Sequence, residues 1–220
     1  MCFSVQADLA VGVGLIPIAV LSLREVRNRR EVPFALLPAL FAAHQLTESL
    51  VWLGLAGTLS ATTQASAALV YLWFALPVLP VLVPLSVILL EPPGARLRVA
   101  PFLALGAVVA AYLGTALVTS PVAVVQRPHS LSYETGVSNG ATWAVLYVIA
   151  VIGPALLSGY RTIVAFGVLN LAGLTVVAIL LSTSFASVWC VYAALASVLI
   201  LVAMRRRHRR PDPHRIPAPA

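Results

Sequence analysis

Apolar runs of about 20 residues follow one another along this chain, and they restrict its fold more than any other feature. Hydrophobic residues make up 60% of the 220 residues and charged residues 10%. Soluble proteins instead hold about 45–50% apolar and about 25% charged residues. The mean hydropathy is +0.98. The sequence therefore predicts an all-α, polytopic membrane protein.

The length accommodates about seven spans of about 20 residues joined by short connections. We expect one transmembrane domain over residues 1–204, followed over residues 205–220 by a basic, Pro-rich tail that is disordered. The expected spans are Ala7–Leu23, Pro33–Leu55, Ala65–Leu90, Val99–Val118, Ala141–Leu157, Ile163–Leu181 and Phe185–Met204.

Two of these spans carry internal features that bear on packing. Pro77, Pro80 and Pro84 lie in the third span at spacings of three and four, and we expect them to kink or locally open that helix. In the sixth span Gly167, Asn170 and Gly173 recur every three residues. This spacing predicts a face for close helix approach, with one amide able to hydrogen-bond a neighbouring helix.

The distribution of arginine predicts the topology. The connections after spans one, three, five and seven carry Arg, whereas those after spans two, four and six carry only Arg127. By the positive-inside rule this places the N-terminus outside and the C-terminus in the cytoplasm of a multi-pass protein in the cell membrane. No basic residue precedes the first apolar run, so we interpret it as a span and not as a cleaved signal peptide.

The basic residues also exclude some functions. All 14 are Arg, so chemistry that needs a lysine amine, such as a retinal Schiff base, is excluded. The net charge of +7 gathers at the ends of apolar runs, which indicates contact with the lipid bilayer and not with nucleic acid. We expect anionic lipids to contact Arg205–Arg210. The oligomeric state stays open.

The second span holds polar residues at membrane depth. His44, Gln45, Glu48 and Trp52 recur there at helical spacing. A carboxylate in this position is costly and marks a candidate functional site. In one interpretation Glu48 is an acid/base or proton carrier, with His44 as its relay partner or a metal ligand. In the other, these groups and Asn170 bond one another and hold the bundle together.

Other polar and soft groups fall on the same extracytoplasmic half, if the topology is as predicted. They include Asp8 and Tyr133, and Ser187 and Trp189 of the seventh span. We take Gln45, Trp52, Asn170, Ser187 and Trp189 as candidate ligand-binding residues. Cys2 and Cys190 are inert, form a disulfide, or bind a metal together with His129, His44 or Glu48. No motif specifies a cofactor.

Three short motifs indicate a family. Met1–Ser4 reads MCFS, Gln45–Gly54 follows the pattern QxxExxVWLG, and Ser187–Cys190 reads SVWC. With these motifs the chain resembles an uncharacterised family of small multi-pass bacterial membrane proteins. The resemblance implies a membrane location and the same span pattern, and it brings no activity. Asp8 and His44 differ from the side chains usual in that family, which favours the second-span carboxylate and the two cysteines as the site.

Three functions follow from these residues. The first is a protein that binds or transports a small molecule or ion, with a polar cavity open to the outside and centred on Glu48. The second is a membrane enzyme or redox protein that uses a metal or a disulfide at Cys2 and Cys190, with Glu48 as acid/base. The third is a structural or partner-binding subunit whose polar stripe stabilises the bundle.

Overall fold

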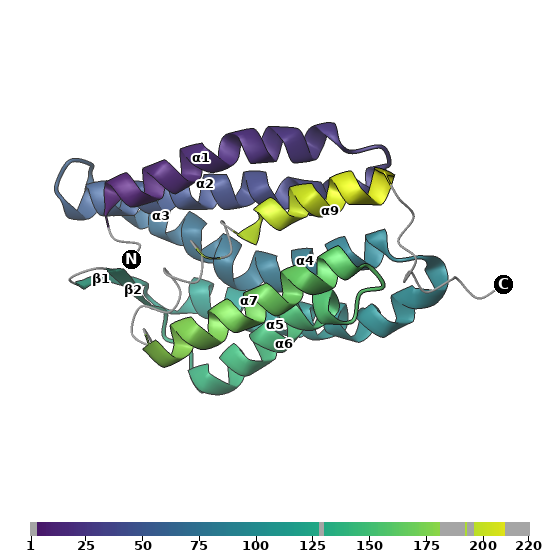
Figure 1. Cartoon of the computed structure of the whole chain (residues 1–220). Coiled ribbons are helices and arrows are strands. Elements are labelled where there is room, and N and C mark those ends of the chain that lie inside the picture. The colour runs from purple at the N-terminus through teal and green to yellow at the C-terminus, as the bar shows by residue number, and fades with distance from the viewer. Residues whose placement is uncertain (1–3, 128–129, 181–191, 193–195, 210–220) are drawn as a thin grey trace.

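The computed structural model describes residues 4–127, 130–180, 192 and 196–209 (Figure 1). Within them the chain is mostly helical. The helices are α1 (Val5–Arg24), α2 (Val32–Leu55), α3 (Ala61–Trp73), α4 (Leu79–Leu90), α5 (Arg96–Thr119), α6 (Gly140–Leu156), α7 (Arg161–Leu180) and α9 (Val198–Arg209). Short 3-10 helices, η1 (Arg29–Glu31) and η3 (Pro93–Ala95), precede α2 and α5, and a π-helix, η2 (Phe74–Val78), joins α3 to α4.

The first four predicted spans coincide with helices long and apolar enough to cross a membrane. In the described residues four such segments occur, at Val5–Arg24, Arg29–Leu55, Ala61–Leu90 and Pro93–Thr119. Gly140–Leu156 and Arg161–Val176 are apolar but shorter. Helices therefore form where spans five and six were expected, but the count of seven spans and the side that each end faces are not established.

The molecule has two distinct ends. At one, which we call the hairpin end, strands β1 (Ala123–Arg127) and β2 (Ser130–Glu134) pair antiparallel, with Val124 opposite Tyr133 (Figure 1). The sequence by itself predicts only a long connection between the fourth and fifth spans. The opposite end, which we call the arginine end, holds the α1–α2 turn, the α4–α5 and α6–α7 connections, and the last turns of α9.

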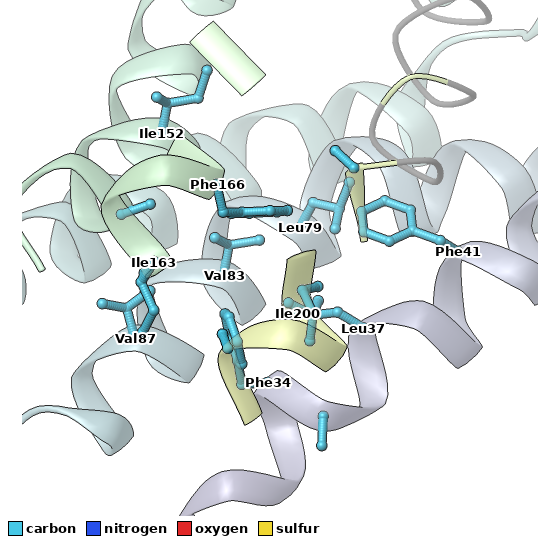
Figure 2. Packing of buried hydrophobic residues seen from close by; sticks show 14 of the residues in the cluster. Phe34, Leu37, Phe41, Leu79, Val83, Val87, Ile152, Ile163, Phe166 and Ile200 are labelled. Carbon is cyan, nitrogen blue, oxygen red and sulfur yellow. The ribbon is translucent and has the colours of Figure 1, made fainter. Parts of the chain in front are cut away.

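Helix α2 lies at the centre of the bundle, where it packs against α1, α3, α4 and α9. Its arginine-end half is apolar and contributes Phe34, Leu37 and Phe41 to the core (Figure 2). Residues of α4, α6, α7 and α9 pack against them, including Leu79, Val83, Val87, Ile152, Ile163, Phe166 and Ile200. Burial of these side chains is the main favourable contribution to packing at this end.

The third span is irregular where its prolines predict it to be. Pro77 lies in η2, and Pro84 has no N–H to donate to the Pro80 carbonyl, which is four residues earlier. Gly106 of α5 lies directly against that carbonyl, so closely that a Cβ atom there would overlap the oxygen. The hydroxyl of Tyr147 donates to the Ala75 carbonyl at 2.6 Å. Neighbouring helices therefore pack against the interrupted backbone.

The predicted face of the sixth span is a close-approach surface. A Cβ atom on Gly167 would lie 2.8 Å from the Ala155 Cβ, and Gly173 lies against the ring of Tyr192. The Asn170 amide, however, donates at 2.7 Å to Phe166 in its own helix. The small residues thus bring the helices together, while this donor satisfies a carbonyl of α7.

Helix α9 runs past the boundary drawn at residue 204 and continues to Arg209. Arg205 Nε lies 3.2 Å from Glu25 Oε1, just after α1. The beginning of the predicted tail is therefore helical and bonded to the α1–α2 turn. Residues 210–220 lie outside the described residues.

Candidate functional site

Three polar or amphipathic side chains share one buried face of α2 near the hairpin end. At about 100° per residue, Gln45, Glu48 and Trp52 fall within an arc of about 60°. Gln45 and Glu48 are 0% exposed and Trp52 is 7% exposed. The helix begins at Val32, with Pro33 in its first turn, and contains no Lys or Arg, so neither of these side chains of α2 supplies a cation to this face.

Asp8 of α1 approaches this face from the neighbouring helix. Gly12 packs against Leu46 and the Ala42 carbonyl, which sets the two helices close together. One turn earlier Asp8 lies beside Trp52 and is 0% exposed. The helix begins beyond Ser4, whose hydroxyl accepts from the Ala7 N–H. The α1 start therefore carries a second carboxyl group to the level of Glu48.

Trp52 is the side-chain hydrogen-bond partner of the Asp8 carboxyl group. Both side-chain amide atoms of Gln45 have no hydrogen bond to any part of the chain that the structure describes. A buried polar group left unsatisfied costs about 1–3 kcal/mol, and more if it is charged. This arrangement therefore lowers the free energy of unfolding, and such a cost is typical of a site that holds a ligand.

A stack of three aromatic rings borders the cluster. His44 stacks on Tyr71 of α3 with ring centroids 3.9 Å apart, and Tyr71 stacks on Tyr133 of β2 at 4.8 Å. The Tyr133 hydroxyl donates to Glu48 Oε1 at 3.5 Å, a long hydrogen bond. The stack joins α2, α3 and the hairpin on the side of Glu48 away from α1.

The hairpin is anchored beside the cluster by an apolar contact. Leu131 is 1% exposed and packs in a small cluster with Val51, Trp52, Ala67 and Ala68. Val5, Val124 and Tyr133 pack around them. The hairpin therefore covers the ends of α2 and α3 and touches the start of α1.

The helices and strands that form the site, α1, α2, α3, β1 and β2, carry only two Lys or Arg side chains, and both lie at the end of an element. Arg24 stands at the far end of α1, and Arg127 is exposed at the end of β1. The α2–α3 connection, α3 and β2 contain no basic side chain. The two carboxyl groups thus share a region without fixed positive charge from these elements.

At the arginine end the carboxylates are bonded. Glu91 is 1% exposed, and its Oε1 accepts from Ser158 Oγ at 2.6 Å and from the Gly159 N–H at 2.8 Å. Its other oxygen lies 3.8 Å from Arg98. Glu31 Oε2 accepts from the Asn28 N–H at 3.3 Å in a capping box, and also from the Arg27 N–H at 2.9 Å. These acids stabilise turns and helix ends.

The structure separates Asn170 from the other candidates. It lines a small cavity of about 20 Å³ together with Phe41, Leu79, Phe166 and Gly167, large enough for about one water. Asn170 therefore belongs to the apolar core between α2, α4, α6 and α7. His44, Gln45, Glu48 and Trp52 do come together.

The remaining candidates cannot be placed. Cys2, His129, Ser187, Trp189 and Cys190 lie outside the described residues. Within the described ranges no group of three or more His, Cys, Asp or Glu is arranged to hold a metal ion. The metal and disulfide hypotheses therefore stay predictions.

Asp8, Tyr71 and Tyr133 belong to the site but are not among the site residues predicted from the sequence. The sequence predicts Asp8 and Tyr133 on the same extracytoplasmic half as Glu48 and gives neither a role. Tyr71 gave no signal, because it lies in an apolar run where a tyrosine is an ordinary core residue.

Comparison with known proteins yields one match. The model of a family of unknown function, DUF6629, matches residues 1–215. Neither the curated proteins nor the solved structures contain a significant match.

Proposed function

The chain belongs to the DUF6629 family, a family of unknown function, so we propose its function from the site alone. We propose that it is an integral membrane protein that binds a small cation, a protonated amine, at the hairpin end. The observation that carries the proposal is the pair of buried carboxyl groups, Asp8 and Glu48. They lie beside the Gln45 amide, whose own two polar atoms have no partner among the described residues. The helices at Val5–Arg24 and Arg29–Leu55, which carry these residues, are long and apolar enough to cross a membrane.

The charge of the site favours a cation. Two carboxyl groups at membrane depth are costly unless a positive charge or a proton neutralises them. A bound ammonium group supplies that charge, and its N–H groups would donate to the acceptors on Asp8 and Gln45. The aromatic side chains Trp52 and Tyr133 add surfaces of the kind that favours organic cations over hydrated metal ions.

The contrast between the two ends supports a ligand over a purely structural role. Glu91 shows how this fold satisfies a buried acid, with a hydroxyl, a backbone N–H and an arginine around it. Asp8 has no comparable set of donors among the described residues. A buried polar group that served only packing would be expected to have its hydrogen bonds completed.

The core lies between this site and the arginine end. His44 is followed toward that end by Phe41, Leu37 and Phe34, all buried. Transport of the amine would require a path past these side chains, so the structure supports binding from the hairpin end. With the predicted topology that end faces the outside of the cell membrane.

The test is equilibrium binding of methylammonium to the purified full chain in detergent, measured by calorimetry. We expect saturable binding to the wild type, and binding at least about tenfold weaker to Asp8→Asn and Glu48→Gln, since each removes one charge from the site. Thr47→Val is the matched control, because the Thr47 hydroxyl bonds the Ala43 carbonyl in its own helix. Tetramethylammonium, which has no N–H, should bind more weakly than methylammonium. Equal binding to all variants would contradict the proposal.

A further inference from the structure

The turn between α1 and α2 presents four arginines to the exterior. Arg24, Arg27, Arg29 and Arg30 are all exposed. Within the part of the chain that the structure describes, none of them forms an ion pair. The turn therefore carries a concentration of positive charge that the protein leaves unneutralised.

The two acids in the same turn are used elsewhere. Glu25 bonds Arg205 of α9 at 3.2 Å. Glu31 accepts from the backbone N–H groups of Arg27 and Asn28, at 2.9 and 3.3 Å. These bonds go to backbone N–H groups and to Arg205, so the acids shape the turn, and with four arginines to two acids its net charge stays positive.

The backbone of the turn is fixed by these bonds. The Asn28 side chain accepts from the Arg30 N–H at 3.1 Å and completes a capping box with Glu31. Such a reciprocal pair holds the first turn of a helix in one conformation. The arginines therefore extend from a preformed backbone, which lowers the ordering cost of binding an anion.

An exposed apolar stripe leads up to this turn along α1. Its residues recur at helical spacing on the outer face of the helix: Leu9, Val13, Ile16, Val20 and Leu23. Arg24 follows the last of them directly. A phospholipid with its acyl chains along the stripe would have its headgroup at the level of the arginines.

From these observations we propose that the α1–α2 turn is a binding site for the headgroup of an anionic phospholipid, whose acyl chains lie along the α1 stripe. Guanidinium groups bind phosphate oxygens in bidentate geometry. The site is independent of the amine site, which lies at the other end of the bundle. It also differs from the predicted lipid contact of the tail, because the turn has its own unpaired arginines.

The experiment measures lipid retention by the purified full chain in native mass spectrometry. Phosphatidylglycerol and phosphatidylcholine of identical acyl chains are supplied in equal amounts. The wild type should retain phosphatidylglycerol preferentially, and the variant R24Q/R27Q/R29Q/R30Q should lose that preference at least about tenfold, because each arginine near a membrane surface contributes to anionic-lipid attraction. The variant R24K/R27K/R29K/R30K, which keeps the charge, should retain part of it.

Two controls make the result decisive. The variant R206Q/R207Q/R209Q neutralises the end of α9 but leaves Arg205 with Glu25, and it should keep most of the preference. Circular dichroism verifies that each variant stays helical. The proposal is overturned if the α9 variant loses the preference and the turn variant keeps it. It is also overturned if inorganic phosphate alone displaces the lipid fully, which would make the ligand a free anion.

Discussion

The hydroxyl of Tyr133 donates to the Glu48 carboxyl group across 3.5 Å, and this contact joins residues 85 positions apart in the chain. It connects a two-stranded hairpin to the central helix of the bundle. The Tyr133 ring also stacks on Tyr71 at 4.8 Å. The hairpin thus contacts the amine site through one polar and one aromatic contact.

Replacement of Tyr133 should separate these two contacts. A 3.5 Å hydrogen bond is weak, so Tyr133→Phe should lower the free energy of unfolding by less than about 1 kcal/mol. Tyr133→Ala also removes the stacked ring and should cost about 1–3 kcal/mol. This is less than the cost for a fully buried aromatic residue, because Tyr133 is half-buried. Thermal unfolding in detergent measures both. Equal losses for the two variants would show that the stack contributes nothing.

Removal of the Asp8 charge should leave the protein as stable as the wild type or more stable. Asp8→Asn keeps the size of the side chain and can keep its contact with Trp52, but it removes the buried charge. The Asn amide is itself a buried polar group, so the expected change is a gain of no more than about 1–2 kcal/mol. A loss of more than about 1 kcal/mol, measured by thermal unfolding without amine, would mean that Asp8 stabilises the bundle and holds no ligand.

Glu91 should behave in the opposite way. Glu91→Ala removes the acceptor of the Ser158 hydroxyl and the Gly159 N–H, leaving two buried donors without a partner. We expect a loss of about 2–5 kcal/mol. Glu134→Ala, at an exposed position of β2, is the control and should change the stability by less than about 0.5 kcal/mol.

Gly106 should tolerate no side chain. A Cβ atom there would meet the Pro80 carbonyl, so Gly106→Ala forces α5 away from α4. An overpacked helix contact of this kind costs about 1–3 kcal/mol or more. Gly14→Ala is the matched control, since a Cβ atom at Gly14 has no neighbour within 4 Å. Alanine there should be neutral or stabilise α1 by up to about 1 kcal/mol. Thermal unfolding of both variants checks the contrast.

Much of the helical framework could be predicted from the sequence. Apolar runs and the residues that stop them, such as Glu91–Gly94 after the third span, place most helix boundaries within a few residues. The stripe of His44, Gln45, Glu48 and Trp52 was also predicted, because polar residues in an apolar run are conspicuous.

The hairpin and the rings around the site could not be predicted in the same way. The hairpin has two strands of five residues, Ala123–Arg127 and Ser130–Glu134. An isolated two-stranded hairpin of this length is only marginally stable. The strands are held by the contact of Leu131 with α2 and α3, which no local pattern reveals. Tyr71 likewise joins the site only because the helices meet there.

The most direct test of the amine site is methylammonium binding to the wild type and to Asp8→Asn, measured by calorimetry under identical conditions. We expect saturable binding to the wild type and a dissociation constant at least about tenfold higher for Asp8→Asn. Circular dichroism verifies that the variant is folded. Binding of equal strength to both proteins, or no binding to the wild type, would contradict the proposal.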